Sequence, residues 1–189
     1  MIIILKDKET VYVAASVDAT YTATHPEDIL NPENLKVWRA AGSDNTLMAS
    51  FNPNSPCIDL LRYTDFEVLH KPLTSPVMIR EVCPTLKEFY AEQQALDEEE
   101  LWSSLVIAKE DKAFLVKPNF TVCDVEDFEC IGFDTSEDVA FGFLTMNPEL
   151  SPIERIAGAF RAVEAGGGNK QFPIVIMNTK TGFRTVIER

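Results

Sequence analysis

The first eighteen residues of the chain, MIIILKDKETVYVAASVD, constrain its fold more than any other stretch. An apolar, β-branched run from Met1 to Leu5 precedes a polar turn over Lys6 to Thr10, and Val11 to Val17 again favours a strand. Because a chain end is loose unless a regular element holds it, such a pattern ties the start of the chain down. The sequence therefore predicts a hairpin with Met1 at the start of a β-sheet.

Strand-like and helix-like blocks alternate along the rest of the chain. A polar stretch from Thr20 to Asn34, rich in turn-forming residues, predicts a long loop. The elements expected after it are, in order, strands over 35–39 and 46–51, helices that open at Ser55-Pro56 and Ser75-Pro76, strands over 105–118 and 120–133, helices that open at Thr135 or Ser136 and at Ser151-Pro152, and strands over 172–177 and 183–187.

Two of the expected helices carry specific predictions. Ile58, Leu61 and Leu60 are expected on the buried face of the helix that Ser55 caps. The region from Ser75 to about Leu96 contains Pro84. Proline removes a backbone donor and clashes with the preceding turn, so either this helix kinks or one short helix ends and another begins.

The helix that opens at Ser151 has the strongest local signals. Ser151-Pro152-Ile153-Glu154 is a capping box with proline in the first turn, and the glycine run Gly166 to Gly168 ends the helix. The residues expected on its buried face are Ile153, Ile156, Ala157, Phe160 and Val163.

The order of strands, helices, strands, helices and strands suits an α+β fold. The expected architecture is a four-layer αββα sandwich, with two sheets face to face and a pair of helices on each outer side. With 189 residues and 46% hydrophobic content, the chain is long enough for one substantial core and too short for two. We therefore expect a single domain over residues 1–189.

Composition excludes several classes of partner. The net charge of -13 argues against nucleic acid, because nucleic-acid affinity rests on clustered Lys and Arg. No apolar run reaches the roughly 18 residues of a membrane span. The opening MIIIL is too short for a signal-peptide core and lacks basic flanks. A soluble, cytoplasmic protein with no membrane contact is expected.

Metal and cofactor sites are not expected either. The cysteines, which show neither a CxxC pair nor histidines at zinc spacing and are expected as free buried thiols, are Cys57, Cys83, Cys123 and Cys130. A carboxylate cluster that suits a hard cation, but that a solvated strand edge explains better, is Asp124, Glu126, Asp127 and Glu129.

Common catalytic motifs are also missing. The only histidines, His25 and His70, stand in no nucleophile motif such as GxSxG, so structural roles are expected. The run Gly166 to Gly168 follows a helix, whereas a phosphate-binding loop precedes one, so the run is interpreted as a helix stop.

Two stretches are informative together, KDKETVYVAASVD near the start and DFECIGFDTSEDVAFGFLTMNPELSPIERIAGAFRAVE further on. Both resemble the proteasome β-subunit and HslV peptidase family of N-terminal-nucleophile hydrolases. KDKET and VYVAASVD are similar to the family's first hairpin, in which a Lys-Asp-Gly-like turn precedes a Val-x-Ala-Ala-Asp strand. DFECIGFDTSEDVAFGFLTMNPELSPIERIAGAFRAVE is similar to the family's Ile-Gly-Ser-Gly turn, the helix after it and the Leu-Ser-x-x-Glu start of the next helix. The order of elements matches over nearly the whole chain, so the resemblance implies the same four-layer fold.

The resemblance also assigns site positions, and the sequence departs from the family at most of them. In the family an N-terminal threonine attacks the peptide carbonyl, and a nearby lysine and aspartate set the electrostatics. Here the nucleophile position falls at Met1, and neither its thioether nor Ile2 behind it has a nucleophilic atom. The aspartate position falls at Ser16, with Asp18 as a displaced substitute on the same face of the strand.

The remaining family positions are partly retained. The oxyanion glycine falls near Ser50, which is expected to offer its backbone N–H, and the Gly-Ser-Gly turn reads Gly132-Phe133-Asp134, without its serine. The later Asp and Ser of the family site fall in the region Gly167–Lys170. Lys36, in LKVWR, either retains the family lysine or is an ordinary surface lysine.

Two functions stay open at this point. The first is a non-catalytic binding or assembly subunit that forms a homo-oligomer, with a ring as one arrangement, and takes a protein or peptide ligand. The second is an active, self-compartmentalising threonine-type peptidase with a processed N-terminus, or a peptidase with a substitute nucleophile such as Ser16 or Thr20. Cleavage before Thr20 would delete the first hairpin and expose sheet edges, which favours the first function.

Overall fold

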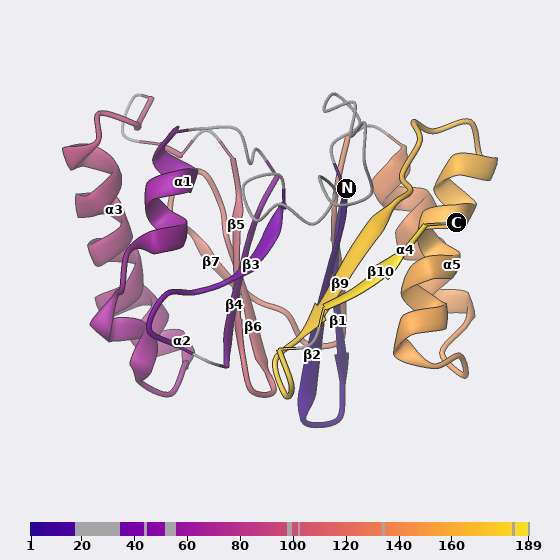
Figure 1. Cartoon of the computed structure of the whole chain (residues 1–189), viewed down its shortest axis with the longest axis horizontal. Helices are drawn as coiled ribbons and strands as arrows, with labels where there is room; N and C mark the ends of the chain where they lie inside the picture. Colours follow the sequence, from indigo (N-terminus) through magenta and orange to yellow (C-terminus); the bar gives the residue numbers. More distant parts are fainter. Residues whose placement is uncertain are drawn as a thin grey trace.

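The computed structural model describes residues 1–17, 35–43, 45–51, 56–97, 100–101, 103–133, 135–182 and 184–188. These residues form two five-stranded antiparallel sheets: sheet A, with strand order β10-β9-β2-β1-β8, and sheet B, with order β3-β4-β5-β6-β7. In Figure 1 the sheets stand side by side in the middle of the molecule and helices cover both outer faces. The predicted α+β, four-layer αββα fold is confirmed.

Sheet A contains the predicted hairpin at its centre. Its strands are β1 (Ile2–Asp7), β2 (Thr10–Ser16), β8 (Phe128–Ile131), β9 (Ile174–Asn178) and β10 (Arg184–Ile187). β1 pairs with β2 on one side and with β8 on the other, so the start of the chain is held between two neighbours.

The apolar residues of β1 serve two cores, because successive side chains of a strand point to opposite faces. Met1, Ile3 and Leu5 belong to the cluster between sheet A and the helices α4 (Ser136–Met146) and α5 (Pro152–Ala165). Ile2 and Ile4 belong to the cluster between the two sheets. Both faces of β1 are therefore buried.

Sheet B consists of β3 (Val37–Arg39), β4 (Thr46–Ser50), β5 (Leu105–Lys109), β6 (Lys112–Val116) and β7 (Val122–Asp124). The strand-like stretch 120–133 contributes to both sheets, since β7 pairs with β6 whereas β8 pairs with β1. Val125 lies at the crossing, is 3% exposed, and donates its N–H to Ala113 O at 2.9 Å. This crossing closes one side of the sandwich.

Helical segments cover the outer face of sheet B. They are α1 (Pro56–Tyr63), the 3₁₀ turn η3 (Glu67–His70), α2 (Ser75–Val77), the π-helical turn η4 (Met78–Val82) and α3 (Cys83–Glu92). Ser55, the predicted cap of α1, lies outside the described residues. Leu60 is 49% exposed, so the prediction that it joins Ile58 and Leu61 in the core is wrong. It points to the outer face of α1.

Pro84 is accommodated differently from either predicted alternative. α2, η4 and α3 follow one another without a break, and the Cys83 N–H donates to Met78 O, five residues back, instead of four. A π turn widens the helix just before the proline, which lacks an N–H to continue the ordinary ladder. The helix ends at Glu92, earlier than predicted.

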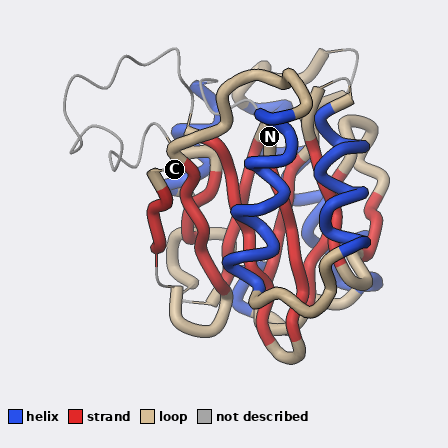
Figure 2. Tube along the Cα trace, turned by 90° about the vertical axis from the view of Figure 1, so that its right-hand side faces the viewer, coloured by secondary structure: helices blue, strands red, loops and turns tan. Residues whose placement is uncertain are grey.

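The pair α4 and α5 covers sheet A, and Figure 2 shows both helices lying along its strands. The predicted capping box of α5 is confirmed: the Glu154 carboxylate accepts the Ser151 N–H at 3.3 Å and its hydroxyl at 2.5 Å. Ile153 is 39% exposed, so its predicted place on the buried face is wrong, because it projects from the first turn beyond the stripe. The other four predicted residues of that stripe are buried.

The two remaining helix predictions concern the start of α4 and the end of α5. Thr135 stands at the N-cap of α4 but its side chain makes no capping hydrogen bond, while the Ser136 hydroxyl donates to Phe133 O at 2.5 Å. The predicted position is right and the predicted capping bond is not formed. After α5, Gly167 adopts φ +88°, a conformation that glycine tolerates well.

Within the described ranges, no helix is long and apolar enough to cross a membrane. All four cysteines are free thiols; Cys57, Cys83 and Cys130 are buried as predicted, whereas Cys123 is half-buried.

Candidate functional site

The start of β1 and the end of β2 form a polar corner at one end of the sandwich. The Met1 nitrogen donates to Ser16 Oγ at 2.9 Å, and the Ser16 N–H donates to Met1 O at 3.1 Å. The Ser16 hydroxyl also lies 3.4 Å from Met1 O. The antiparallel register of β1 and β2, which pairs Ile2 with Ala15, brings these groups together. An amine and a hydroxyl are therefore in direct contact here.

The Met1 side chain packs into the protein. Met1 is 6% exposed and belongs to the apolar cluster beneath α4 and α5. A Cβ placed on Gly132 would lie 3.6 Å from Met1 Cγ, so the thioether side chain fills the space beside this glycine. The position that the family resemblance assigns to a nucleophile thus holds an unreactive side chain in van der Waals contact with the core.

The backbone amide expected at the oxyanion position, that of Ser50, and the amide of Gly132 in the Gly-Ser-Gly-like turn are both engaged within the protein. The Ser50 N–H donates to Lys36 O at 2.9 Å, and its hydroxyl lies 3.2 Å from Ser103 Oγ. The Gly132 N–H donates to Glu137 Oε1 at 2.6 Å. The expectation that Ser50 offers its N–H to a ligand is therefore wrong, since strand pairing between β3 and β4 consumes that donor.

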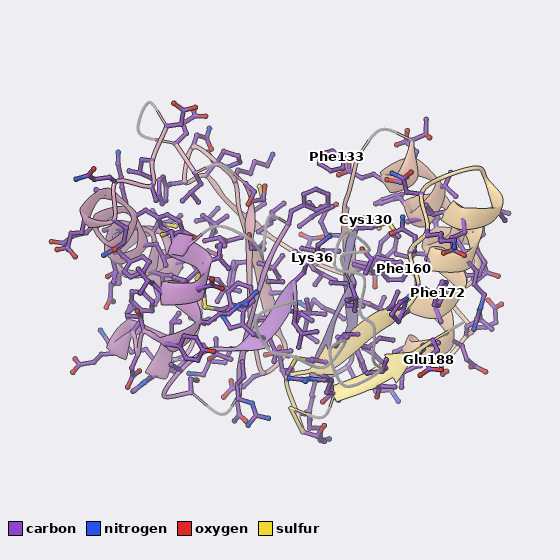
Figure 3. The ribbon with its side chains drawn as sticks, turned by 45° about the horizontal axis from the view of Figure 1, so that its top comes forward. Lys36, Cys130, Phe133, Phe160, Phe172 and Glu188 are labelled. Carbon is purple, nitrogen blue, oxygen red and sulfur yellow. The ribbon has the colours of Figure 1, made fainter. Side chains whose placement is uncertain are left out.

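Lys36 is a buried lysine. It is 8% exposed, and its Nζ lies 5.4 Å from the centre of the Phe51 ring, a cation–π geometry. In Figure 3 Lys36 lies in the middle of the molecule, between the two sheets. The alternative that Lys36 is an ordinary surface lysine is wrong, although its burial alone does not assign it a chemical role.

A pocket of about 640 Å³ opens at this corner. It is lined by Met1, Ser16, Val17, Lys36, Phe51, Phe133, Thr135, Ser136 and the loop Gly166–Gln171. Of the predicted site residues, Met1, Ser16 and Lys36 meet in it, whereas Ser50 and Gly132 are not among its lining residues. Asp18 and Thr20 lie outside the described residues. A second cavity of about 580 Å³, lined by residues of β3 and β10, contains none of the predicted site residues.

The loop between α5 and β9 forms one wall of the pocket. Glu164 Oε1 accepts the N–H groups of Gln171 at 2.6 Å and of Phe172 at 3.2 Å, and the Gly168 N–H donates to Val163 O at 3.0 Å. These bonds hold both ends of the loop against α5. The glycine run is thus a helix stop, as predicted, and also a pocket wall, in the region where the resemblance loosely placed later site residues.

Two aromatic residues that the sequence did not indicate form the rim. The rings of Phe51, from sheet B, and Phe133, from the β8–α4 connection, meet edge to face with centres 4.5 Å apart. Phe133 is 69% exposed despite this contact. It occupies the place of the missing serine in the Gly-Ser-Gly-like turn, and that replacement was the one sequence signal available.

Other nucleophiles and metal ligands are poorly placed. Burial raises the pKa of Cys57 and of Cys83 to about 11 and that of Cys130 to about 12, so these thiols stay protonated at neutral pH. His70 Nε2 lies 2.7 Å from Asp65 Oδ1, away from the pocket, and His25 is not among the described residues. In the described part of the chain, no three His, Cys, Asp or Glu side chains gather as a metal site.

The fold and the pocket together define a class: a four-layer αββα protein whose first strand begins inside a pocket at the end of the sandwich. Solved structures of low sequence identity share the fold. BPH from Thiobacillus denitrificans in complex with epoxomicin has a TM-score of 0.64 and 17% identity, covering 94% of this chain and 96% of that one.

Two further solved structures share the fold. Eukaryotic HslV from Trypanosoma brucei has a TM-score of 0.57 and 14% identity over 94% of this chain and 97% of that one. Anbu, the ancestral beta-subunit from Yersinia bercovieri, has a TM-score of 0.62 and 10% identity over 100% of this chain and 87% of that one. No protein-family model and no curated protein matches the sequence. The chain has the HslV-like, proteasome-like N-terminal-nucleophile hydrolase fold, as the resemblance implied.

Proposed function

We propose that this chain, acting as one domain over residues 1–189 in the cytoplasm, is a non-catalytic binding or assembly subunit of this fold. The observation that carries the proposal is Met1, whose side chain packs against the core beside Gly132 at the head of β1. A thioether cannot form the acyl intermediate that a hydroxyl or thiol nucleophile forms. The pocket would then keep its shape but would not catalyse hydrolysis.

The surroundings of Met1 support the same conclusion. The aspartate position holds Ser16, which is neutral, and none of the described lining residues of the pocket is Asp or Glu. The two amides at the family's oxyanion and turn positions, those of Ser50 and Gly132, already donate to protein oxygens. An oxyanion needs preorganised donors directed at the reacting atom. Such donors would have to come from elsewhere.

Hydrolysis of a diverse library of internally quenched peptides tests the absence of catalysis. We expect no turnover above that of a Ser16→Ala variant, because neither protein would contain a reactive hydroxyl in the required role. Turnover by the original protein that Ser16→Ala abolishes would contradict the proposal.

The assembly part of the proposal is a homo-oligomer, with a closed ring as one arrangement. Helix α4 exposes two large apolar side chains on the outer layer of the sandwich, Phe141 at 48% and Met146 at 81%. Exposed apolar side chains on one helix are a typical feature of protein contact surfaces. Size-exclusion chromatography with light scattering is expected to give a multiple of 21.2 kDa. A monomer at all concentrations would remove assembly from the proposal and leave binding.

One observation favours a second candidate, a hydrolase with a substitute nucleophile. Ser16 Oγ lies 2.9 Å from the Met1 nitrogen. This pair offers the same hydroxyl and amine that N-terminal-nucleophile enzymes carry on a single residue, here divided between two. The candidate predicts covalent labelling of Ser16 by a hydroxyl-directed inhibitor, and peptide mapping of the labelled protein would detect it. A processed N-terminus belongs to the same candidate and predicts a truncated intact mass.

A further inference from the structure

The outermost strand of sheet A, β10, leaves one edge of that sheet unpaired. It stands at the end of the strand order β10-β9-β2-β1-β8, and Figure 2 shows it at the border of the sheet, leading to the C-terminus. We propose that this edge pairs antiparallel with β10 of a second copy of the chain, so that two A sheets join into one. The inference rests on the assembly part of the proposed function and names a contact surface for it.

The composition of β10 suits strand pairing. All four of its residues are half-buried, and the last three, Thr185 to Ile187, include two β-branched aliphatic side chains. By contrast β8, at the other border of sheet A, contains Glu129 and follows Glu126 and Asp127. Charged side chains keep an edge strand from pairing with another chain. The only charge of β10 is at its first residue, so its edge lacks this protection.

The two faces of β10 restrict the register of the pair. Val186 packs against the cluster between the two sheets, whereas Ile187 packs against the cluster beneath α4 and α5. Opposite residues of an antiparallel pair share a face, so a residue of one parity must lie opposite a residue of the same parity. A two-fold axis through Val186 meets this condition. It places Val186 opposite Val186 of the second copy, and Thr185 opposite Ile187 of the second copy.

Charge complementarity favours this register over its neighbours. It places Arg184 opposite Glu188 of the second copy, and the two-fold axis repeats this contact at the other end of the pair. A shift by two residues would instead place Arg184 opposite Val186. Opposite charges directly across two strands stabilise their pairing.

Glu188 is the group that the contact would satisfy. It is exposed directly after β10 (Figure 3) and makes no ion pair within the described part of the chain. Arg184 is half-buried and already engaged within its own chain, but a guanidinium has five N–H donors and accommodates more than one acceptor. The contact therefore adds a partner for Glu188 without requiring a free arginine.

Oxidative cross-linking of the full chain tests the contact and its register. In Val186→Cys the two new thiols would lie opposite each other, with Cβ atoms about 4.5–5.5 Å apart, close enough for a disulfide after a small adjustment. We expect a covalent dimer on a non-reducing gel after mild oxidation. Thr185→Cys is the matched control, because its thiol would face Ile187, and it should give no more dimer than the original protein. No dimer from Val186→Cys, or an equal yield from Thr185→Cys, would overturn the inference.

Sedimentation over a dilution series tests the charge pair. Glu188→Lys places like charges opposite each other at both ends of the pair, so the dissociation constant should rise about tenfold. Glu149→Lys, at an exposed position before α5, makes the same change in net charge and should leave it unchanged. Equal effects of the two variants would overturn the inference.

The original protein separates failure of this inference from failure of the proposed function. If it stays monomeric at every concentration, the assembly part of the proposed function fails together with the β10 contact. If it assembles but Val186→Cys gives no cross-link, only the β10 contact fails.

Discussion

At the end of the sandwich where β1 begins, an ammonium, two lysines and three hydroxyls line a pocket of about 640 Å³, whereas at the end where β9 finishes the buried Thr179 bonds to two backbone groups beside a pocket of about 500 Å³. There Thr179, 1% exposed, accepts the Val11 N–H at 3.0 Å and donates its hydroxyl to Glu110 O at 2.5 Å. One threonine thereby links sheet A to the β5–β6 turn of sheet B.

This contrast separates a buried polar side chain that stabilises the fold from the polar lining of the larger pocket. Buried polar groups are normally paired, and leaving one unpaired costs free energy. At the Thr179 end every group just named has a partner in the protein. At the Met1 end Thr135 keeps its hydroxyl free of its own helix, and Lys170 lies exposed beside it in the same pocket. Substitutions at the two ends should therefore have different consequences.

The largest expected effect is at Thr179. Thr179→Val keeps the shape of the side chain but leaves the Val11 N–H and the Glu110 carbonyl without this hydrogen-bond partner. The free energy of unfolding should therefore fall by about 2–4 kcal/mol. Urea denaturation measures this loss of stability. Thr181→Val, at an exposed position in the following turn, is the control and should stay within about 0.5 kcal/mol of the original protein. Equal effects would show that the Thr179 link is not a stabilising contact.

A pair of glycines around α4 gives the next effect. A Cβ on Gly132 would meet Ser136 Oγ at 2.8 Å and Met1 Cγ at 3.6 Å, so Gly132→Ala should destabilise the protein by about 1–3 kcal/mol. A Cβ on Gly142, within α4, meets nothing within 4 Å. Gly142→Ala should therefore stabilise the protein by about 0.5–1 kcal/mol, because alanine favours helices. Thermal unfolding compares the stabilities of the two variants. A Gly132→Ala variant as stable as the original protein would contradict the close packing of Met1 beside this glycine.

The smallest effect concerns the capping box of α5. Hydrogen bonds from the Ser151 hydroxyl and then from its backbone N–H hold the pKa of Glu154 below its usual range. A lowered pKa in the folded state contributes stability that is present above the unfolded value of about 4.3 and is lost as pH falls through the folded value. Glu154→Gln should thus lower the unfolding temperature at pH 7 and have less effect at pH 3.

Glu149→Gln, at an exposed position just before α5, controls for the change in net charge. If both variants show the same dependence on pH, the capping box is not its cause.

Sequence signals predicted the elements whose causes are local. The hairpin follows from β-branched residues around a polar turn, and the start of α5 follows from four consecutive residues. The division of 120–133 between two sheets and the exposure of Leu60 depend on neighbours distant in the chain. Local pattern does not contain that information.

The candidate site was predictable only in part for the same reason. The family resemblance brought Met1, Ser16 and Lys36 to one place, and the structure gathers all three in the pocket. It did not reveal that Lys36 O accepts the Ser50 N–H, or that Phe51 and Phe133 meet across the rim. Both depend on how β3, β4 and the β8–α4 connection approach each other.

The most direct measurement is the intact mass of the untagged protein before and after incubation with epoxomicin, the compound in complex with the structurally similar Thiobacillus denitrificans BPH. A non-catalytic pocket headed by Met1 predicts a full-length mass that epoxomicin does not change. A stoichiometric adduct, or a mass that shows a new first residue with a hydroxyl or thiol, would contradict the proposal and identify the nucleophile.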